Sequence, residues 1–439
     1  MTFRISRRSL TKTTASAAAL GSAVALGARS SVFAAPALIQ STGSQVEITY
    51  WTSFGSGVNG DAQTKIINDF QAANPDIVIT SSIYPGYADL AAALVTALQT
   101  GDEPHVAILS DVWWFRFYLA EAITDLAPLL ASEGVDTDDY VQSLYTEYTR
   151  NGGQWAVPFA RSTPLLYFNR DAVEAAGLDE SIFKTWSSFA EAAPTLTGGT
   201  TDYAFVTSPD DAWGLQGAVW AFGGRYSDED FNILINQPEA VAAGDYFRNL
   251  IANGYASASV DSGTDFATGL AAASIQSTGG LRSIAEAAKF NIGTAFLPEE
   301  TQFGCSTGGS GLSIIATAPD EVKAAAIKFL DFSTNTQNAM EWSQNTGYMP
   351  VRTSSVESAD MQAYLAENPN AQVAIDQLPK TQPQDSARVF IPGGDQMLGA
   401  AWSNILVNQT PAQDAFDAVA ADLDAEKEAV LEQIAAIEG

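Results

Sequence analysis

Residues 46–79 read VEITYWTSFGSGVNGDAQTKIINDFQAANPDIVI, and this stretch decides the fold class. Residues 46–51 alternate between apolar and polar side chains, which is typical of a half-buried strand. Residues 61–73 carry apolar side chains at helical spacing, and an Asn-Pro pair ends that helix. Residues 77–79 then begin a second strand, so the stretch predicts a strand-helix-strand unit.

The same alternation extends towards the C-terminus. Residues 87–99 place Leu90, Leu94 and Leu98 on one face of a second helix, and residues 105–109 form a short apolar strand. Strands that alternate with helices in this way indicate a three-layer α/β domain with a largely parallel sheet.

A second set of strands and helices follows Gly152 and Gly153 and predicts a second α/β lobe. The expected strands cover residues 154–158, 165–168, 273–276, 293–296 and 312–315. The expected helices cover residues 171–176, 238–252, 281–289, 320–333 and 411–437. Neither a fixed-period repeat nor a low-complexity linker separates these elements, so we expect two lobes in close contact.

The composition is that of a globular but strongly acidic protein. The chain has 439 residues, 46% of them apolar and 16% charged, which predicts two or three domains with large cores. It carries 21 Lys and Arg against 51 Asp and Glu. A nucleic-acid-binding surface is not expected, because phosphate backbones require clustered cations. Any anionic ligand would need a local positive pocket.

The N-terminus predicts export. Residues 1–34 combine the pair Arg7 and Arg8 in a twin-arginine pattern with a mildly apolar segment and small residues up to a cleavage site at Ala34. The alternative is a disordered basic tail. Residues 35–44 read as a linker. Because the only cysteine, Cys305, is far from this signal, we expect neither a lipid anchor nor an intrachain disulfide. We therefore expect a free periplasmic protein exported by the Tat route.

Three turns share a design that suits a polar ligand. Residues 161–163 (Arg-Ser-Thr), 277–280 (Ser-Thr-Gly-Gly) and 306–311 (Ser-Thr-Gly-Gly-Ser-Gly) all offer hydroxyl groups beside a predicted strand. The glycines of the last two let backbone N–H groups approach a ligand closely, and the second turn opens a helix whose free N–H groups favour an anion or polar oxygen. The alternative for each is an ordinary turn.

Aromatic residues could stack on the C–H face of a sugar, although core packing is the alternative for each of them. The tryptophans near predicted strand ends or loops are Trp51, Trp113, Trp114, Trp155, Trp213, Trp220, Trp342 and Trp402.

Signals for catalysis are weak. His105 is the only histidine and precedes a buried strand, so a catalytic triad would depend wholly on it, and a zinc site is not expected. A glycosidase pair of carboxylates stays open, because 51 acids make chance pairs inevitable. No phosphate-binding or dinucleotide-binding fingerprint follows a strand. We expect no metal and no cofactor.

Several long segments resemble the extracellular solute-binding proteins of ABC importers, most closely the branch that binds glycerol 3-phosphate and glycerophosphodiesters. The resemblance covers nearly the whole chain after the export signal, and its sharpest segments are YPGYADLAAALVTALQTGDEPHVAIL (84–109), PFARSTPLLYFNRDAVEAAGLD (158–179), STGGLRSIAEAAKFNIGTAFLP (277–298) and AIKFLDFSTNTQNAMEWSQNTGYMPV (326–351). It implies the two-lobed type II fold, with hinged lobes that close over a ligand and each hold a mostly parallel sheet flanked by helices. The implied lobes are residues 45–152 plus 305–345 and residues 153–304 plus 346–439.

The resemblance also implies ligand contacts residue by residue. Arg388 matches an arginine that pairs with phosphate, and Arg161 could assist it. The other matched positions are cleft residues, namely Tyr87, Ser162, either Ser277 or Thr278, Gly309 and Tyr348.

Two departures affect the expected ligand. Asp111 stands where the branch has a glutamate that is one methylene longer. The branch also has a pair of pocket tryptophans where this chain has Asp210, Asp211 and only Trp213. Carboxylates there would disfavour an anion and suit sugar hydroxyls, so a glycerol-phosphate compound and a small saccharide both stay open.

The sequence thus predicts a monomeric binding protein that delivers a small polar ligand, unaltered, to the permease subunits of an ABC transporter. The alternatives are a secreted glycosidase that uses an Asp/Glu pair and, with less support, an adhesive or structural surface protein.

Overall fold

The computed structural model describes residues 45–439, which carry two five-stranded sheets. The predicted export signal at residues 1–34 and the linker at residues 35–44 lie outside the described residues. None of the helices between residues 45 and 439 is long and apolar enough to cross a membrane.

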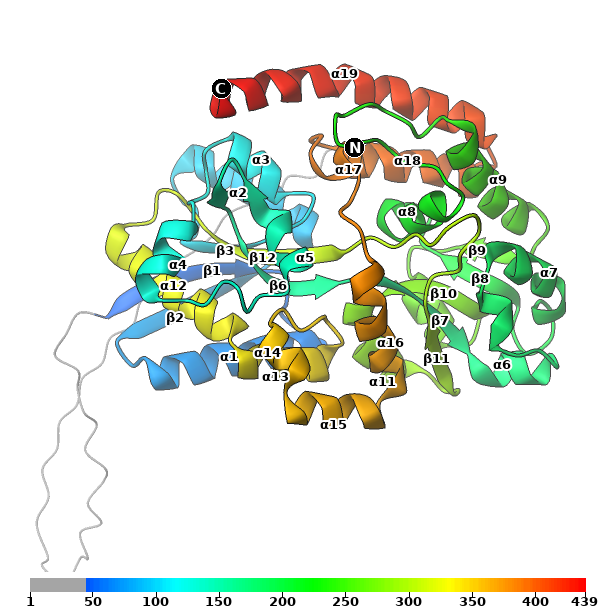
Figure 1. Cartoon of the computed structure of the whole chain (residues 1–439), viewed down its shortest axis with the longest axis horizontal. Coiled ribbons are helices and arrows are strands. Elements are labelled where there is room, and N and C mark those ends of the chain that lie inside the picture. The colour runs from blue at the N-terminus through cyan, green and yellow to red at the C-terminus, as the bar shows by residue number, and fades with distance from the viewer. Residues whose placement is uncertain (1–44) are drawn as a thin grey trace, which may run out of the picture. The chain divides into compact units, whose positions relative to one another are not determined.

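The first sheet has the strand order β2-β1-β3-β12-β6 (Figure 1). β1 pairs in parallel with β2 and β3, whereas β12 runs antiparallel to both β3 and β6. The strands cover β1 (Val46–Thr52), β2 (Ile77–Ile83), β3 (Val106–Ser110), β6 (Val157–Ser162) and β12 (Gly308–Ile314).

The second sheet has the order β11-β7-β10-β8-β9. β8 pairs in parallel with β9 and β10, while β7 runs antiparallel to β10 and β11. The strands cover β7 (Pro164–Asn169), β8 (Tyr203–Thr207), β9 (Ala256–Ala258), β10 (Ala271–Ser277) and β11 (Ile292–Ala295). A short hairpin joins β4 (Thr149–Arg150) to β5 (Gly153–Gln154).

Both sheets are therefore mixed, with four strands in one direction and a single strand, β12 or β7, against them, which agrees with the expectation of mostly parallel sheets. The late strand β12 enters the first sheet against the direction of β3, and β7 enters the second sheet against β10. Each of these two strands directly follows a segment in which the chain passes from one sheet to the other.

Helices cover the faces of both sheets (Figure 1). Those that pack with the first sheet or its neighbours are α1 (Gly57–Ala73), α2 (Tyr87–Thr100), α3 (Trp114–Leu119), α4 (Ala127–Glu133), α5 (Gln142–Tyr145), α12 (Asp320–Thr334), α13 (Thr336–Thr346) and α14 (Thr353–Glu357). Those of the second part are α6 (Arg170–Ala175), α7 (Trp186–Leu196), α8 (Ala212–Ala221), α9 (Pro238–Ala252), α10 (Ser262–Ala267), α11 (Leu281–Ala287), α15 (Ala359–Glu367), α16 (Pro369–Gln377), α17 (Ser386–Val389), α18 (Gly394–Leu406) and α19 (Ala412–Glu438).

The chain first passes between the sheets at Thr163, because β6 still pairs with β12 of the first sheet and β7 belongs to the second. It returns between β11 and β12, and passes over again after α14 to reach α16, which packs on β11. We keep the predicted division into two lobes as a proposal. In it, the chain first passes from one lobe to the other at Thr163, and not at Gly152 as expected.

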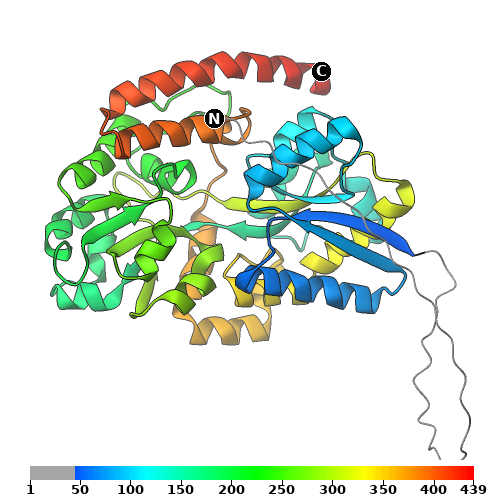
Figure 2. The ribbon, with the colours of Figure 1, turned by 180° about the vertical axis from the view of Figure 1, so that it is seen from behind.

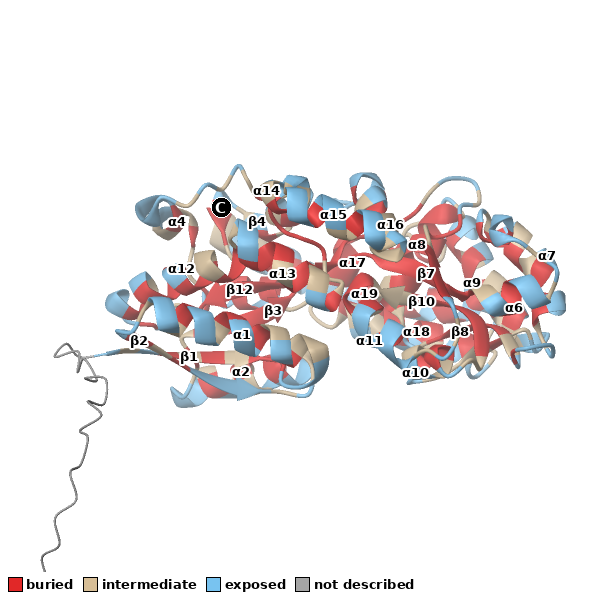
Figure 3. Ribbon diagram, turned by 90° about the horizontal axis from the view of Figure 1, so that it is seen from below, coloured by how far each residue is buried: buried red, intermediate tan, exposed pale blue. Residues whose placement is uncertain are grey.

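The core fills both lobes, with buried strands under helices whose outer faces are exposed (Figure 3). Five tryptophans are almost completely buried, and they are Trp114, Trp186, Trp220, Trp342 and Trp402. Cys305 is also fully buried, and burial raises the pKa of its thiol well above the usual value.

The long helix α19 extends from the second lobe over the first (Figures 1 and 2). Its body packs on α18 and α9. At its end, Glu438 accepts hydrogen bonds from Arg150 Nε at 2.6 Å and Nη2 at 3.1 Å, and from the Tyr118 hydroxyl at 2.9 Å. These contacts, which we call the α19 clasp, tie the two lobes together.

Candidate functional site

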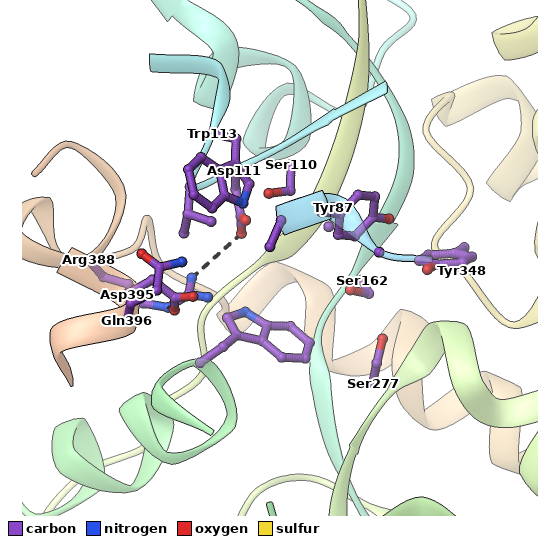
Figure 4. A pocket seen from close by; sticks show the side chains of 15 residues that line it. Tyr87, Ser110, Asp111, Trp113, Ser162, Ser277, Tyr348, Arg388, Asp395 and Gln396 are labelled. Atoms are coloured by element: carbon purple, nitrogen blue, oxygen red, sulfur yellow. Dashed lines mark ion pairs between the residues drawn. The ribbon is translucent and has the colours of Figure 1, made fainter. Parts of the chain in front are cut away.

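A cavity of about 460 Å³ lies where the two lobes face each other, and most of the predicted site residues line it. Figure 4 shows Arg388, Asp395 and Gln396 at one end of it and Tyr348 and Ser277 at the other. The predicted residues that line it are Tyr87, Asp111, Ser162, Trp213, Ser277, Gly309, Tyr348 and Arg388. Their contact with a ligand stays a prediction.

The ends of strands and helices bring these residues together. Asp111 follows β3, Ser162 ends β6 and Ser277 ends β10. Tyr87 begins α2, and its hydroxyl hydrogen-bonds the Ser310 hydroxyl of β12 at 3.0 Å. Both sheets therefore direct polar side chains at one volume, as α/β folds do at the carboxyl ends of their strands.

Thr278 does not line the cavity whereas Ser277 does, so the prediction of a ligand contact is kept for Ser277. Thr278 is fully buried at the crossing between the lobes. Its backbone N–H donates to Thr163 O at 3.0 Å, and its hydroxyl oxygen accepts from Thr163 N at 3.3 Å. Ser277 faces the cavity and accepts the N–H of Gly279 at 3.1 Å.

Glycines in the third predicted turn allow two close approaches. Gly309 has φ +107°, and a Cβ there would lie 2.1 Å from Ala160 O in the neighbouring strand. A Cβ on Gly308 would lie 2.4 Å from Trp213 Nε1, so the indole can pack flat on the backbone. Trp213 Nε1 donates to Thr307 O at 3.1 Å, which fixes the ring at the cavity wall.

Arg388 is held between two carboxylates. Its Nε lies 2.8 Å from Asp395 Oδ1, and its Nη1 lies 3.7 Å from Asp111 Oδ2. Gln384 joins the two groups, since its amide nitrogen donates to Asp111 Oδ2 and its amide oxygen accepts from Arg388 Nη1. Burial alone lowers the pKa of the Arg388 guanidinium, but Asp395 and Asp111 raise it above the usual value, so the group stays charged.

Arg161 does not reach the cavity, contrary to the expectation that it could assist Arg388. It is completely buried, pairs with Glu147, and donates to the Tyr148 hydroxyl at 2.7 Å. Burial raises the pKa of Glu147 to about 7 even though Arg161 opposes that change. Arg161 thus supports the wall behind the cavity.

Asp210 and Asp211 also do not line the cavity, so the sequence argument from their carboxylates is wrong. Asp211 is the N-cap of α8, where its carboxylate accepts the N–H of Gly214 at 2.8 Å. Burial raises the pKa of Asp211 to about 6. Asp210 accepts the Ser208 hydroxyl at 2.8 Å.

Aromatic side chains form the apolar part of the wall. Trp113 and Trp213 line it from the two lobes, together with Tyr87 and Tyr348. A Cβ on Gly279 would lie 2.5 Å from the Tyr348 ring, so the glycine leaves room for that ring. Most other tryptophans singled out in the sequence belong to the core.

Ser110, Trp113, Asp395 and Gln396 line the cavity but were not predicted as site residues. Ser110 could have been found, because it directly precedes Asp111 at the end of a predicted strand. Asp395 and Gln396 lie in the first turn of α18, a helix that the sequence analysis did not predict.

Residues 45–439 contain no cluster of three or more His, Cys, Asp or Glu side chains that could hold a metal ion. His105 pairs with Thr49 of β1, accepting its N–H at Nδ1 at 3.1 Å, and lies outside the cavity.

Comparisons with known proteins agree with this geometry. Residues 65–371 match the profile of a family described as "Bacterial extracellular solute-binding protein". The chain is 28% identical over 353 residues to the sn-glycerol-3-phosphate-binding periplasmic protein UgpB of Salmonella typhimurium, covering 75% of this chain and 80% of that protein.

Solved structures are similar over almost the whole described chain. The crystal structure of UgpB from Mycobacterium tuberculosis in complex with glycerophosphocholine has a TM-score of 0.83 and 39% identity, covering 88% of this chain and 98% of that one. The GacH receptor of Streptomyces glaucescens has a TM-score of 0.77 at 18% identity, covering 88% of this chain and 99% of that one, a likeness of fold alone.

Proposed function

We propose that this chain, which belongs to the bacterial extracellular solute-binding protein family, captures a glycerol-phosphate compound in its interlobe cavity for delivery to an ABC permease. The observation that carries the proposal is Arg388. It is the one cation among the residues that line the cavity, and it is buried and charged. A guanidinium beside several hydroxyl groups in a cavity is suited to a phosphate.

The relatives support the same ligand class. UgpB of M. tuberculosis, 39% identical, holds glycerophosphocholine in its crystal structure, and the S. typhimurium relative is named for glycerol 3-phosphate. Ser110, Ser162 and Ser277 offer hydroxyl groups to phosphate and glycerol oxygens.

A small saccharide is the second candidate. Trp113 and Trp213 face the cavity and could stack on the C–H faces of a sugar, and Asp111 could accept hydroxyl hydrogen bonds. Against this, the carboxylate of Asp111 already accepts from Gln384 and faces Arg388.

Isothermal titration calorimetry with glycerophosphocholine, glycerol 3-phosphate and maltose tests the ligand. We expect at least one phosphate compound to bind with one-to-one stoichiometry, and Arg388→Ala to lose that binding. Arg225→Ala is the control, because Arg225 is a partly exposed arginine outside the cavity that pairs with Asp385. Binding of maltose alone, or undiminished phosphate binding by Arg388→Ala, would contradict the proposal.

We further propose that the protein is not an enzyme. The carboxylates that line the cavity, Asp111 and Asp395, both face Arg388 instead of flanking an open glycosidic site. Prolonged incubation with glycerophosphodiesters and oligosaccharides should give back unaltered compounds. Catalytic release of products would support the glycosidase or another hydrolase instead.

Export by the Tat route, release without a lipid anchor and a monomeric state complete the proposal. The first two rest on the twin-arginine pattern in residues 1–34 and on the position of the single cysteine, Cys305, far from that pattern. Export of the full chain from cells with and without a Tat translocase, followed by sedimentation of the exported protein, tests all three.

A further inference from the structure

Two carboxylates and an amide of the protein already contact the Arg388 guanidinium. Nε faces Asp395 at 2.8 Å, and Nη1 donates to Gln384 and faces Asp111 at 3.7 Å. The contact of Nε with Asp395 is an ion pair without hydrogen-bond geometry, and within residues 45–439 the guanidinium donates one hydrogen bond, from Nη1 to Gln384. Both carboxylates nonetheless lie in ion-pair contact with the guanidinium, so they offset part of the positive charge that it offers to a phosphate.

The charge balance at this end of the cavity points the same way. Arg388 contributes one positive charge, while Asp111 and Asp395 contribute two negative charges at the cavity wall. The other lining residues are neutral side chains or glycines. The nearest further charges, Glu147 with Arg161 and the capping residue Asp211, lie behind the wall.

Phosphate esters differ in charge at neutral pH. A phosphate monoester carries about −1.5 to −2 at pH 7, because its second pKa is near 6. A phosphodiester has no second ionisable proton and keeps a single negative charge. A monoester therefore meets more repulsion from Asp111 and Asp395 than a diester does, and one arginine cannot balance it.

We propose that Asp395 is a specificity residue which, with Asp111, makes the cavity select glycerophosphodiesters over phosphate monoesters. This inference rests on the proposed function, since it presumes that Arg388 meets a phosphate. Asp395 is well placed for the role because its carboxylate, in the first turn of α18, contacts the guanidinium, which also faces Asp111 directly after β3.

A purely structural role for Asp395 would behave differently. If Asp395 only orients Arg388, its removal should weaken the binding of monoesters and diesters alike. If it excludes the second charge, its removal should improve monoester binding relative to diester binding. The ratio of the two dissociation constants therefore separates a role in selection from a role in positioning.

The experiment compares glycerophosphocholine and glycerol 3-phosphate by calorimetry at pH 8 in the wild type, Asp395→Asn and the control Asp210→Asn. The control makes the same change at a carboxylate outside the cavity that accepts only from Ser208. We expect Asp395→Asn to shift the ratio of dissociation constants on the order of tenfold towards the monoester. That is the size expected for one unit of charge at roughly 10 Å with an effective dielectric constant near 20.

Each outcome decides one of the two proposals. If the wild type binds neither phosphate compound, the proposed function fails. If the wild type binds glycerophosphocholine but Asp395→Asn leaves the ratio unchanged, or lowers both affinities equally, the function stands and the selection by Asp395 is overturned. Asp395→Ser serves as a second variant should Asp395→Asn not fold, because a serine in the first turn of α18 removes the charge and keeps a polar group.

Discussion

Gly309 shows how a single residue fixes the floor of the cavity. It lies in β12 with φ +107°, a conformation that side chains with a Cβ rarely adopt. A Cβ at this position would clash with the carbonyl oxygen of Ala160, and the backbone N–H of Asp111 donates to the carbonyl oxygen of Gly309 at 3.0 Å. The position of Asp111 at the cavity thus depends on a glycine that is distant in sequence but lies in the neighbouring strand of the sheet.

We predict that Gly309→Ala lowers the free energy of unfolding by at least about 3 kcal/mol, because backbone strain and a clash with Ala160 O add together. Urea unfolding followed by tryptophan fluorescence measures the loss. Gly254→Ala is the matched control, since Gly254 has φ +73° but nothing within 4 Å of a Cβ, and it should cost about 1 kcal/mol. Equal losses would show that the contact is not restrictive.

Asp211 gives a prediction about pH. Its pKa is about 6 in the folded protein because of burial, against an ordinary value near 3.9 when unfolded. Between these values the folded state holds a proton that the unfolded state has released, so the free energy of unfolding falls as the pH rises from about 4 to about 6. Above that window this residue adds no further change.

We expect Asp211→Asn to raise the free energy of unfolding at pH 7.5 by about 2 kcal/mol relative to its effect at pH 4. Asparagine keeps the cap of α8 and removes the half-buried charge. Urea unfolding at several pH values, with Asp210→Asn as the control, measures the difference. Parallel pH curves for Asp211→Asn and the wild type would contradict the prediction.

The sequence predicts site residues well where local chemistry marks them and poorly where only the fold does. Ser162 and Gly309 stood out because hydroxyl and glycine turns border strands, and both line the cavity. Asp211 was misread because a carboxylate in a pocket and a carboxylate that caps a helix look the same in sequence. Asp395 gave no signal, since its partner Arg388 lies in a separate short helix.

At the scale of elements, the amphipathic helix α9 was predicted closely, whereas the almost fully buried helix α8 was missed. The helix expected at residues 238–252 is α9 with the same bounds, because one face is buried and the other exposed. Every residue of α8 except Trp213 is buried, so it has no apolar stripe to detect. Strand directions were harder still, because the pairing partners of β12 are distant in sequence.

Packing of α19 on the second lobe depends on Phe416, which is fully buried with its ring edge-on to Trp402 at 5.4 Å between centroids. We predict that Phe416→Ala lowers the free energy of unfolding by about 3–5 kcal/mol, through lost burial and the cavity it leaves. Leu431→Ala, at an exposed position of the same helix, should cost less than about 1 kcal/mol. Chemical denaturation compares them, and similar losses would mean that α19 is not anchored at Phe416.

At the scale of the whole molecule, the α19 clasp links ligand binding to the relation between the lobes. Residues of both lobes line the cavity, so a ligand needs the lobes in the arrangement that brings these residues together. In this arrangement Glu438 of the second lobe contacts Arg150 and Tyr118 of the first. Loss of the clasp should therefore lower the fraction of molecules that are ready to bind, which raises the apparent dissociation constant.

We predict that Glu438→Gln weakens glycerophosphocholine binding by about two- to fivefold, the size expected for a partly exposed ion pair. Glu432→Gln changes an exposed glutamate of the same helix and should leave the affinity unchanged. Calorimetry gives the affinities, and small-angle scattering reports the lobe arrangement. Unchanged or tighter binding by Glu438→Gln would show that the clasp does not favour the binding arrangement.

The buried thiol of Cys305 has a practical consequence for observing such motion. It is the only cysteine in the chain, fully enclosed and held protonated by its surroundings, so dyes that attack thiolates will pass it over. Cysteines introduced at exposed sites such as Ile83 and Val260, one beside each sheet, would take up a donor and an acceptor fluorophore without further engineering. Two introduced cysteines would therefore be enough to follow lobe motion by energy transfer between fluorophores, and the native cysteine need not be removed.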